Sequence, residues 1–193
     1  MREYLKFYID GQWVAPVEPG TVVEAINPAT EEVSGRIALG SAADVDRAVA
    51  AARRAFATWS RTTREERLEV LERILAEYQK RVGDLAAAIT EEMGAPKALA
   101  NGFQVGLGTG HLTTAIEVLR NFHFEEQRGA TRIVKEPIGV CGMITPWNWP
   151  VNQVTVKVFP ALATGCTMVV KPSQESRFSA CVLAEILDAA GVP

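Results

Sequence analysis

Residues 139–173 read GVCGMITPWNWPVNQVTVKVFPALATGCTMVVKPS, and this stretch decides the fold. Residues 139–144 form a short apolar run bounded by glycine and proline, which is typical of a buried strand. Apolar side chains then recur at helical spacing from Val151 to Leu162, with Pro160 bending the end of the helix, and a second apolar run occupies 166–170. A strand, a helix and a strand in this order predict a right-handed parallel βαβ unit.

Polar loops follow both of these strands. The sequence Pro-Trp-Asn-Trp-Pro occupies 146–150, and Lys-Pro-Ser-Gln occupies 171–174. Because the two strands are parallel, both loops lie at the carboxyl edge of the sheet, where open α/β sheets bind ligands. The amide of Asn148 and the ammonium of Lys171 are therefore expected to meet at one crevice.

The residues before this unit predict a hairpin and several helices. Residues 7–14 read FYIDGQWV, in which Asp-Gly is a preferred type I′ turn between two aromatic strands, and 33–38 predict a short strand. Ser41 is the expected cap of the first helix. The apolar stripe of that helix is expected to face inward and consists of Val45, Ala48, Val49, Ala52 and Phe56.

Further caps and glycines divide the rest of the chain. Thr63 with Glu66 forms a capping box for a second helix, and a further helix is expected to end near Gly94. The glycine-rich stretch 102–110 does not match a dinucleotide fingerprint, which favours close helix packing or a loop over a phosphate cradle. Ser176 is the expected cap of the last helix.

Composition excludes several classes of function. The chain has 193 residues, a net charge of −3, 48% hydrophobic and 22% charged residues, which is typical of a globular protein and argues against a nucleic-acid or anionic-membrane binder. No apolar run approaches the roughly 20 residues of a membrane helix. Three scattered cysteines predict reduced core thiols and a cytoplasmic setting. His111 and His123 lack the cysteine or carboxylate partners of a metal site.

PWNWP, the helix that carries Lys157, and FPALATGCTMVVKPS together resemble the first half of the cofactor domain of the aldehyde dehydrogenase superfamily. The resemblance runs from about residue 26 to residue 193. It implies an incomplete Rossmann-like parallel sheet, an α/β fold, preceded by helices and an N-terminal β-hairpin. It also implies oxidation of a small-molecule aldehyde to a carboxylic acid with NAD, and a homo-oligomer joined through the weakly alternating segment 124–137, a predicted hairpin arm.

The resemblance assigns roles to individual residues. It implies that the Asn148 amide holds an oxyanion, that Lys157 assists at the catalytic site and that Lys171 binds the adenosine ribose. By sequence alone, Asn148 is equally a loop-capping residue, and Lys157 is better explained as a solvated lysine. Gln174 stands where the family commonly has a glutamate, and because Gln does not repel a 2′-phosphate, NADP is the alternative cofactor. The remaining expected cofactor contacts are Ile144, Thr145, Pro146, Trp147 and Ser173.

The family's cysteine nucleophile and general-base glutamate have no match in this sequence. None of the three cysteines lies in a segment like the nucleophile motif, so we expect the 193-residue chain alone to be inactive. The expected organisation is a hairpin and helical part over 1–123, the arm over 124–137 and the start of the cofactor-binding sheet over 138–193. The alternative function is a non-catalytic subunit or interaction module that docks through the arm or an open sheet edge.

Overall fold

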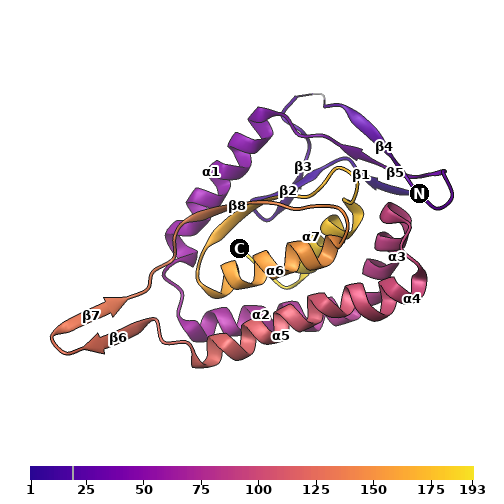
Figure 1. Cartoon of the computed structure of the whole chain (residues 1–193). Helices are drawn as coiled ribbons and strands as arrows, with labels where there is room; N and C mark the ends of the chain where they lie inside the picture. Colours follow the sequence, from indigo (N-terminus) through magenta and orange to yellow (C-terminus); the bar gives the residue numbers. More distant parts are fainter. Residues whose placement is uncertain (19) are drawn as a thin grey trace.

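The computed structural model describes residues 1–18 and 20–193 (Figure 1). Its strands are β1 Arg2–Tyr4, β2 Phe7–Ile9, β3 Gln12–Val14, β4 Val22–Ile26, β5 Val33–Ala38, β6 Glu125–Arg128, β7 Thr131–Val134, β8 Val140–Ile144 and β9 Thr167–Lys171. Its helices are α1 Ala42–Trp59, α2 Arg64–Lys80, α3 Val82–Met93, α4 Lys97–Leu99, the π-helix η1 Ala100–Gln104, α5 Val105–Asn121, α6 Pro150–Ala163 and α7 Phe178–Ala189.

The predicted βαβ unit is confirmed. Strands β8 and β9 are parallel and in register from Val140 opposite Thr167 to Ile144 opposite Lys171, and α6 connects them. Both α6 and α1 pack against the strand pair. The predicted fold class is therefore confirmed: an α/β chain in which an incomplete Rossmann-like sheet follows helices and an N-terminal hairpin.

Five helices surround the main hydrophobic core. Helices α2, α3, α5, α6 and α7 contribute most of its fully buried side chains, among them Tyr78, Phe159 and Phe178. The Tyr78 hydroxyl is satisfied because it donates a 2.9 Å hydrogen bond to the carbonyl of Val105. Gly108 lets α5 approach this ring, since a Cβ at that position would lie 2.1 Å from the Tyr78 oxygen. The glycine-rich stretch is thus helical, and close packing explains this one of its glycines.

The N-terminal strands form two small sheets beside this core. The hairpin β2–β3 has the predicted type I′ turn, with φ of 57° at Asp10 and 68° at Gly11. A second sheet has the order β1-β5-β4, with β1 parallel to β5. Tyr4 of β1 packs against Phe178 with their ring centroids 6.1 Å apart, which joins this sheet to α7.

The predicted starts of α1 and α2 are confirmed, but the predicted inward face of α1 is wrong at two of its five residues, Val45 and Val49. Ser41 and Thr63 each form a complete capping box. Val45 and Val49, expected inside, are 54% and 38% exposed. Ala52 is buried as predicted, and Ala51 and Trp59 are buried beside it, because small side chains allow the helix backbone to approach β9.

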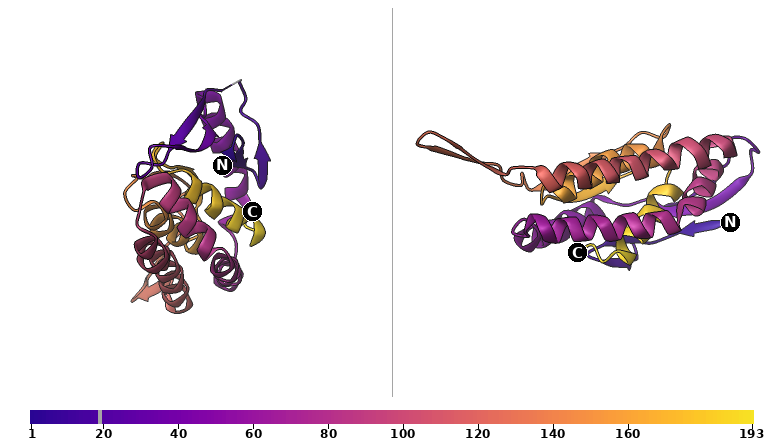
Figure 2. Two further views of the ribbon diagram at one scale, coloured as in Figure 1. Left: turned by 90° about the vertical axis from the view of Figure 1, so that its right-hand side faces the viewer. Right: turned by 90° about the horizontal axis from the view of Figure 1, so that it is seen from below.

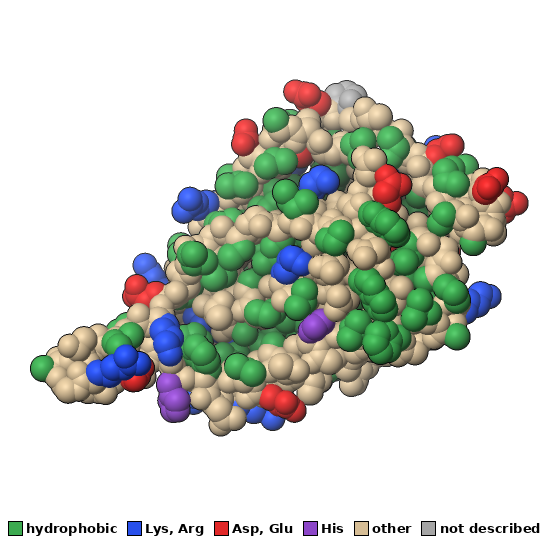
Figure 3. Space-filling model, in the orientation of Figure 1, with side chains coloured by type: hydrophobic (Ala, Val, Ile, Leu, Met, Phe, Trp, Pro, Cys, Tyr) green, Lys and Arg blue, Asp and Glu red, His purple; other side chains and the backbone are tan. Residues whose placement is uncertain are grey.

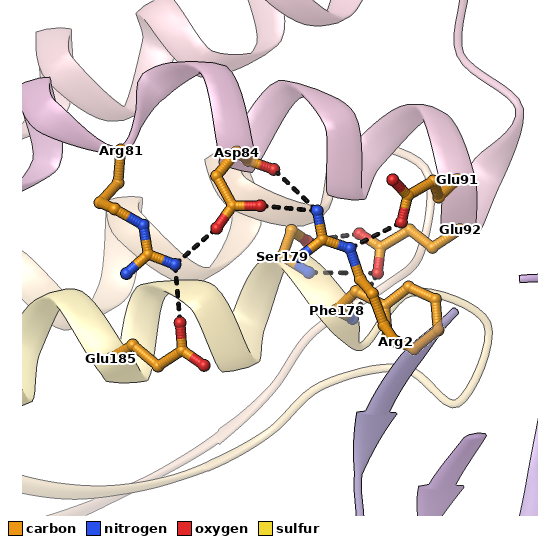
Figure 4. Close-up of polar contacts among 8 residues, drawn as sticks. All are labelled: Arg2, Arg81, Asp84, Glu91, Glu92, Phe178, Ser179 and Glu185. Carbon is orange, nitrogen blue, oxygen red and sulfur yellow. Dashed lines mark hydrogen bonds and ion pairs between the residues drawn. The ribbon is translucent and has the colours of Figure 1, made fainter. Parts of the chain in front are cut away.

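The expected cap of α7 is wrong. The Ser176 hydroxyl is buried and has no hydrogen-bond partner among the described residues. The first backbone N–H groups of α7 donate instead to Glu92 at the end of α3 (Figure 4). A cap from a residue that distant in sequence leaves no local signal.

Strands β6 and β7 form the predicted hairpin, which projects away from the body of the molecule (Figures 1 and 2). The two strands pack chiefly against each other, and nearly all of their residues are exposed. Among the described residues, no helix is both long enough and apolar enough to cross a bilayer. The same residues contain no cluster of three or more His, Cys, Asp or Glu side chains placed to hold a metal ion.

Candidate functional site

The loops after β8 and β9 lie side by side at one edge of the strand pair. The backbone N–H of Thr145 donates a 3.3 Å hydrogen bond to the carbonyl of Lys171, which joins the two loops where the strands end. Thr145 is 4% exposed, whereas its neighbour Ile144 is 76% exposed. The edge therefore presents an apolar side chain beside a buried threonine that fixes the backbone.

The first loop holds Asn148 in an exposed position. Pro150 is the first residue of α6, where proline is favoured because its missing N–H leaves no helical bond unmade. Trp149 packs edge-on against Phe103 of η1, with ring centroids 5.6 Å apart at 70°, and this contact anchors the loop. The Asn148 amide makes no hydrogen bond to any other described residue, so the loop-capping role is not seen. Pro146 and Trp147 of the same loop are exposed.

Lys157 is held on its own helix. Its Nζ donates to the carbonyl oxygen of Gln153 at 2.9 Å and to the side-chain Oε1 of Gln153 at 3.1 Å. Among the described contacts none joins Lys157 to Asn148. The half-buried ammonium is thus oriented by one turn of α6 rather than by the loop.

The second loop places three polar side chains near the end of β9. Lys171 is exposed, and its Nζ makes only a long 3.5 Å contact with the carbonyl of Pro172. The Ser173 hydroxyl accepts from the backbone N–H of Glu175 at 3.2 Å, and the Gln174 amide donates to the Glu175 carboxylate at 2.8 Å. The ammonium of Lys171 is therefore the freest hydrogen-bond donor of this loop.

The described residues form two hollows, of which one adjoins the second loop. A cavity of about 100 Å³ lies beside Gln174 and Arg177, and a largely apolar groove of about 330 Å³ lies between α5 and α6. Hydrophobic side chains gather on the face of the molecule that carries these two helices (Figure 3). The groove contains His111, whose Nε2 lies 2.6 Å from Oδ1 of Asn152. No sequence pattern indicated this polar pair, because the partner of His111 lies on another helix.

Comparison with known proteins decides the family. A model of the aldehyde dehydrogenase family matches residues 13–193. The chain belongs to the aldehyde dehydrogenase family. The resemblance inferred from PWNWP and the βαβ unit is thereby confirmed over nearly the whole chain.

Individual aldehyde dehydrogenases agree in sequence and in fold. The chain is 56% identical to a 3-succinoylsemialdehyde-pyridine dehydrogenase of Pseudomonas sp, over all of this chain and 40% of that protein. It superposes on the crystal structure of an aldehyde dehydrogenase from Bartonella henselae with a TM-score of 0.96 and 46% identity, covering 100% of this chain and 41% of that one. It also superposes on a mutant of aldehyde dehydrogenase C from Pseudomonas syringae, solved in complex with NAD+ and octanal. The TM-score is 0.95 and the sequence identity 52%, over 97% of this chain and 39% of that one. The chain spans about 40% of the length of the curated relatives that it matches.

Proposed function

We propose that this chain forms part of an NAD(P)-dependent aldehyde dehydrogenase that oxidises an aldehyde to a carboxylic acid. The observation that carries the proposal is the position of Asn148, whose amide is exposed and unbonded at the carboxyl edge of the strand pair. This edge is where parallel α/β sheets bind ligands. The family match and the neighbours solved with NAD+ support the same chemistry.

The residues at this edge fit one portion of a dinucleotide. Exposed Ile144 and Trp147 offer flat apolar surface, and the loosely held ammonium of Lys171 offers donors to ribose hydroxyls. Ser173 and Gln174 lie beside it, and neither carries a charge that would repel a 2′-phosphate, so both NAD and NADP are compatible with this loop. A nicotinamide cofactor held at this edge would supply the hydride acceptor for the oxidation.

The proposed role of Asn148 is to donate its side-chain N–H to the oxyanion that develops on the aldehyde oxygen. One such donor typically lowers the barrier by ~3 kcal/mol. The role proposed for Lys157 is electrostatic: its ammonium, oriented by Gln153 on the helix that begins just after the loop, adds positive potential near the site. We assign neither the thiol nucleophile nor the general base of the proposed reaction to any residue of 1–193.

Substituting Asn148 with alanine in the native gene product tests the catalytic assignment. We expect kcat for aldehyde-dependent NADH formation to fall about 100-fold or more, with the Kd of NAD+ changed little. The matched control is Asn152→Ala, one turn into α6, where the side chain contacts His111 instead. An equal fall in kcat in the two variants, or no fall in Asn148→Ala, would contradict the proposed oxyanion role of Asn148.

Substituting Lys171 with methionine tests the cofactor assignment separately. We expect a roughly tenfold rise in the Kd of NAD+ measured by calorimetry, because a charge-assisted hydrogen bond to the ribose is lost. Lys135→Met is the control, since Lys135 lies next to the projecting hairpin and its ammonium binds the carbonyl of His123. An unchanged Kd would place the cofactor elsewhere.

We also propose that β6–β7 joins subunits of a homo-oligomer. Its almost complete exposure and its few contacts with the rest of the chain support an intermolecular partner. The alternative of a non-catalytic interaction module uses the same hairpin, and it is favoured if a variant without 125–134 becomes monomeric in light scattering while the native oligomer shows no aldehyde oxidation. We place the protein in the cytoplasm, which its three free thiols support.

A further inference from the structure

Two cysteines outside the candidate site stand beside each other on the βαβ unit. Cys141 is the second residue of β8 and lies opposite Met168, and Cys166 stands two residues before Met168. Because side chains alternate along a strand, all three share one face. Thr167 points to the other face, where its hydroxyl donates a 2.8 Å hydrogen bond to the carbonyl of Ala52 in α1. The two cysteines are therefore diagonal neighbours on the face away from α1.

The surroundings of Cys166 favour a thiolate. The Thr164 hydroxyl lies 3.7 Å from its sulfur, within hydrogen-bond reach, and also reaches the carbonyl of Pro160 at 2.9 Å. The buried guanidinium of Arg67 packs so closely on Gly165 that a Cβ there would lie 2.5 Å from it, which brings a cation next to Cys166. Cationic and N–H-rich surroundings of this kind activate cysteines.

The two thiols differ in acidity. Burial opposes ionisation of Cys166, but the hydrogen bonds to its sulfur outweigh burial and leave its pKa below the ordinary value. Burial, together with the neighbouring sulfur of Cys166, raises the pKa of Cys141. The sulfur of Cys166 is thus disposed to attack as a thiolate, while Cys141 retains its proton. Cys141 is only half-buried, so solvent can reach the pair from its side.

We propose that Cys141 and Cys166 form a redox-active dithiol that hydrogen peroxide converts into an intrachain disulfide. The Cys166 thiolate attacks one peroxide oxygen, the O–O bond breaks, and the hydroxide that leaves takes up the proton released when the thiol ionised. The sulfur of Cys141 then attacks the resulting sulfenic acid, the S–O bond breaks, and a second water leaves with the thiol proton. Two thiols are oxidised, and one peroxide is reduced to two waters.

This reaction is independent of the proposed aldehyde chemistry. Cys141 and Cys166 lie toward the amino end of the strand pair, whereas Asn148 and Lys171 lie at or beyond its carboxyl end. The disulfide would link β8 to the residue that precedes β9 without entering the candidate site. Oxidation is therefore expected to alter the stability of the strand pair first.

Peptide mapping of the chain after treatment with hydrogen peroxide tests the proposal. Trypsin places the three cysteines in separate peptides, 136–157, 158–177 and 178–193, because Lys171 precedes proline and is not cleaved. We expect the first two peptides to be joined, with a mass two hydrogens below their sum, and to separate on treatment with dithiothreitol. Cys181 is the internal control, since burial raises its pKa to about 12 and its peptide should keep an alkylatable thiol.

Two variants sharpen the result. In Cys141→Ser the resolving thiol is absent, so we expect the 158–177 peptide to gain oxygen instead of forming a cross-link. Cys181→Ser should behave as the wild type. The wild-type map decides the matter even if a Cys166 variant does not fold. Three alkylatable thiols after peroxide, a cross-link between chains, or a cross-link that includes Cys181 would each overturn the proposal.

Discussion

The carboxylate of Glu92, at the end of α3, accepts a 2.6 Å hydrogen bond from the backbone N–H of Phe178, the first residue of α7 (Figure 4). The next N–H, that of Ser179, donates to the same oxygen at 3.2 Å, and the Ser179 hydroxyl bonds the other oxygen. Glu92 thus does for α7 what an N-cap side chain does for other helices, and its side chain is almost wholly buried in doing so.

The stability of the fold should fall as pH rises through neutrality because of Glu92. Burial raises the pKa of its carboxyl to about 7 from 4.5, although the hydrogen bonds from Ser179 and Phe178 act in the opposite direction. Between these two values the folded chain binds more protons than the unfolded chain. The contribution of Glu92 to the free energy of unfolding is therefore fully present below its unfolded pKa. It is lost as pH rises through the folded pKa, and the loss is on the order of 3 kcal/mol. Urea denaturation at several pH values measures this change.

Glu92→Gln isolates the contribution of this residue. Glutamine keeps an acceptor for the N–H of Phe178 but does not titrate, so the variant should lose most of the pH dependence between about 4.5 and about 7. A variant whose unfolding free energy depends on pH as steeply as that of the wild type would assign the effect to other groups.

Arg2 ties the start of the chain to α3, and its loss should cost about 1–2 kcal/mol. Its Nη2 and Nε lie 2.6 Å from the carboxylates of Asp84 and Glu91, respectively, and its side chain is 20% exposed. Arg2→Met removes both pairs in a partly desolvated position. Arg36→Met is the control on a neighbouring strand, because its pair with Glu3 is about half exposed and screened by solvent, so its loss should change stability far less. Thermal unfolding at low and high salt would compare the two, and equal losses would contradict this distinction.

Gly108→Ala should destabilise the contact between α5 and α2 by about 1–3 kcal/mol. The added Cβ would meet the hydroxyl of Tyr78, which must then shift from its bond to Val105. Gly106→Ala, two residues earlier on the same helix, meets nothing within 4 Å and should stabilise the chain by up to about 1 kcal/mol, because alanine favours helix. The midpoint of chemical denaturation should therefore fall in Gly108→Ala and rise in Gly106→Ala. A shift of the same sign in both variants would contradict the packing argument.

Ser41→Ala and Ser176→Ala should differ although both serines precede helices. Ser41 caps α1, and its loss should cost about 1 kcal/mol. The buried hydroxyl of Ser176 has no partner among the described residues, so removing it should leave stability unchanged or raise it slightly. Calorimetric melting temperatures would show the difference. A larger fall in melting temperature for Ser176→Ala than for Ser41→Ala would indicate that Ser176 caps α7 after all.

Local signals located most elements before any tertiary information. The boundaries of the hairpin turn, of the helices that begin after Ser41 and Thr63, and of the βαβ unit follow from residues that act within a few positions of one another. The inward face of α1 followed only in part: Ala52 is buried as predicted, but Val45 and Val49 are exposed, because they satisfy helical periodicity as well as the residues that pack. The order of the strands alone predicted that the loops carrying Asn148 and Lys171 lie at the carboxyl edge of the strand pair. The catalytic and cofactor-binding roles of these residues stay predictions.

The sequence by itself determined the family, the parallel strand pair and the convergence of the Asn148 and Lys171 loops, because short-range spacing and strand direction suffice for these. Only the tertiary structure decided that Glu92 caps α7, that Arg2 joins α3 and that Cys141 shares a face of the strand pair with Cys166. Each of these contacts joins elements that are separate in sequence. Which side chains meet there depends on how helices and strands pack, and no local pattern of residues encodes that.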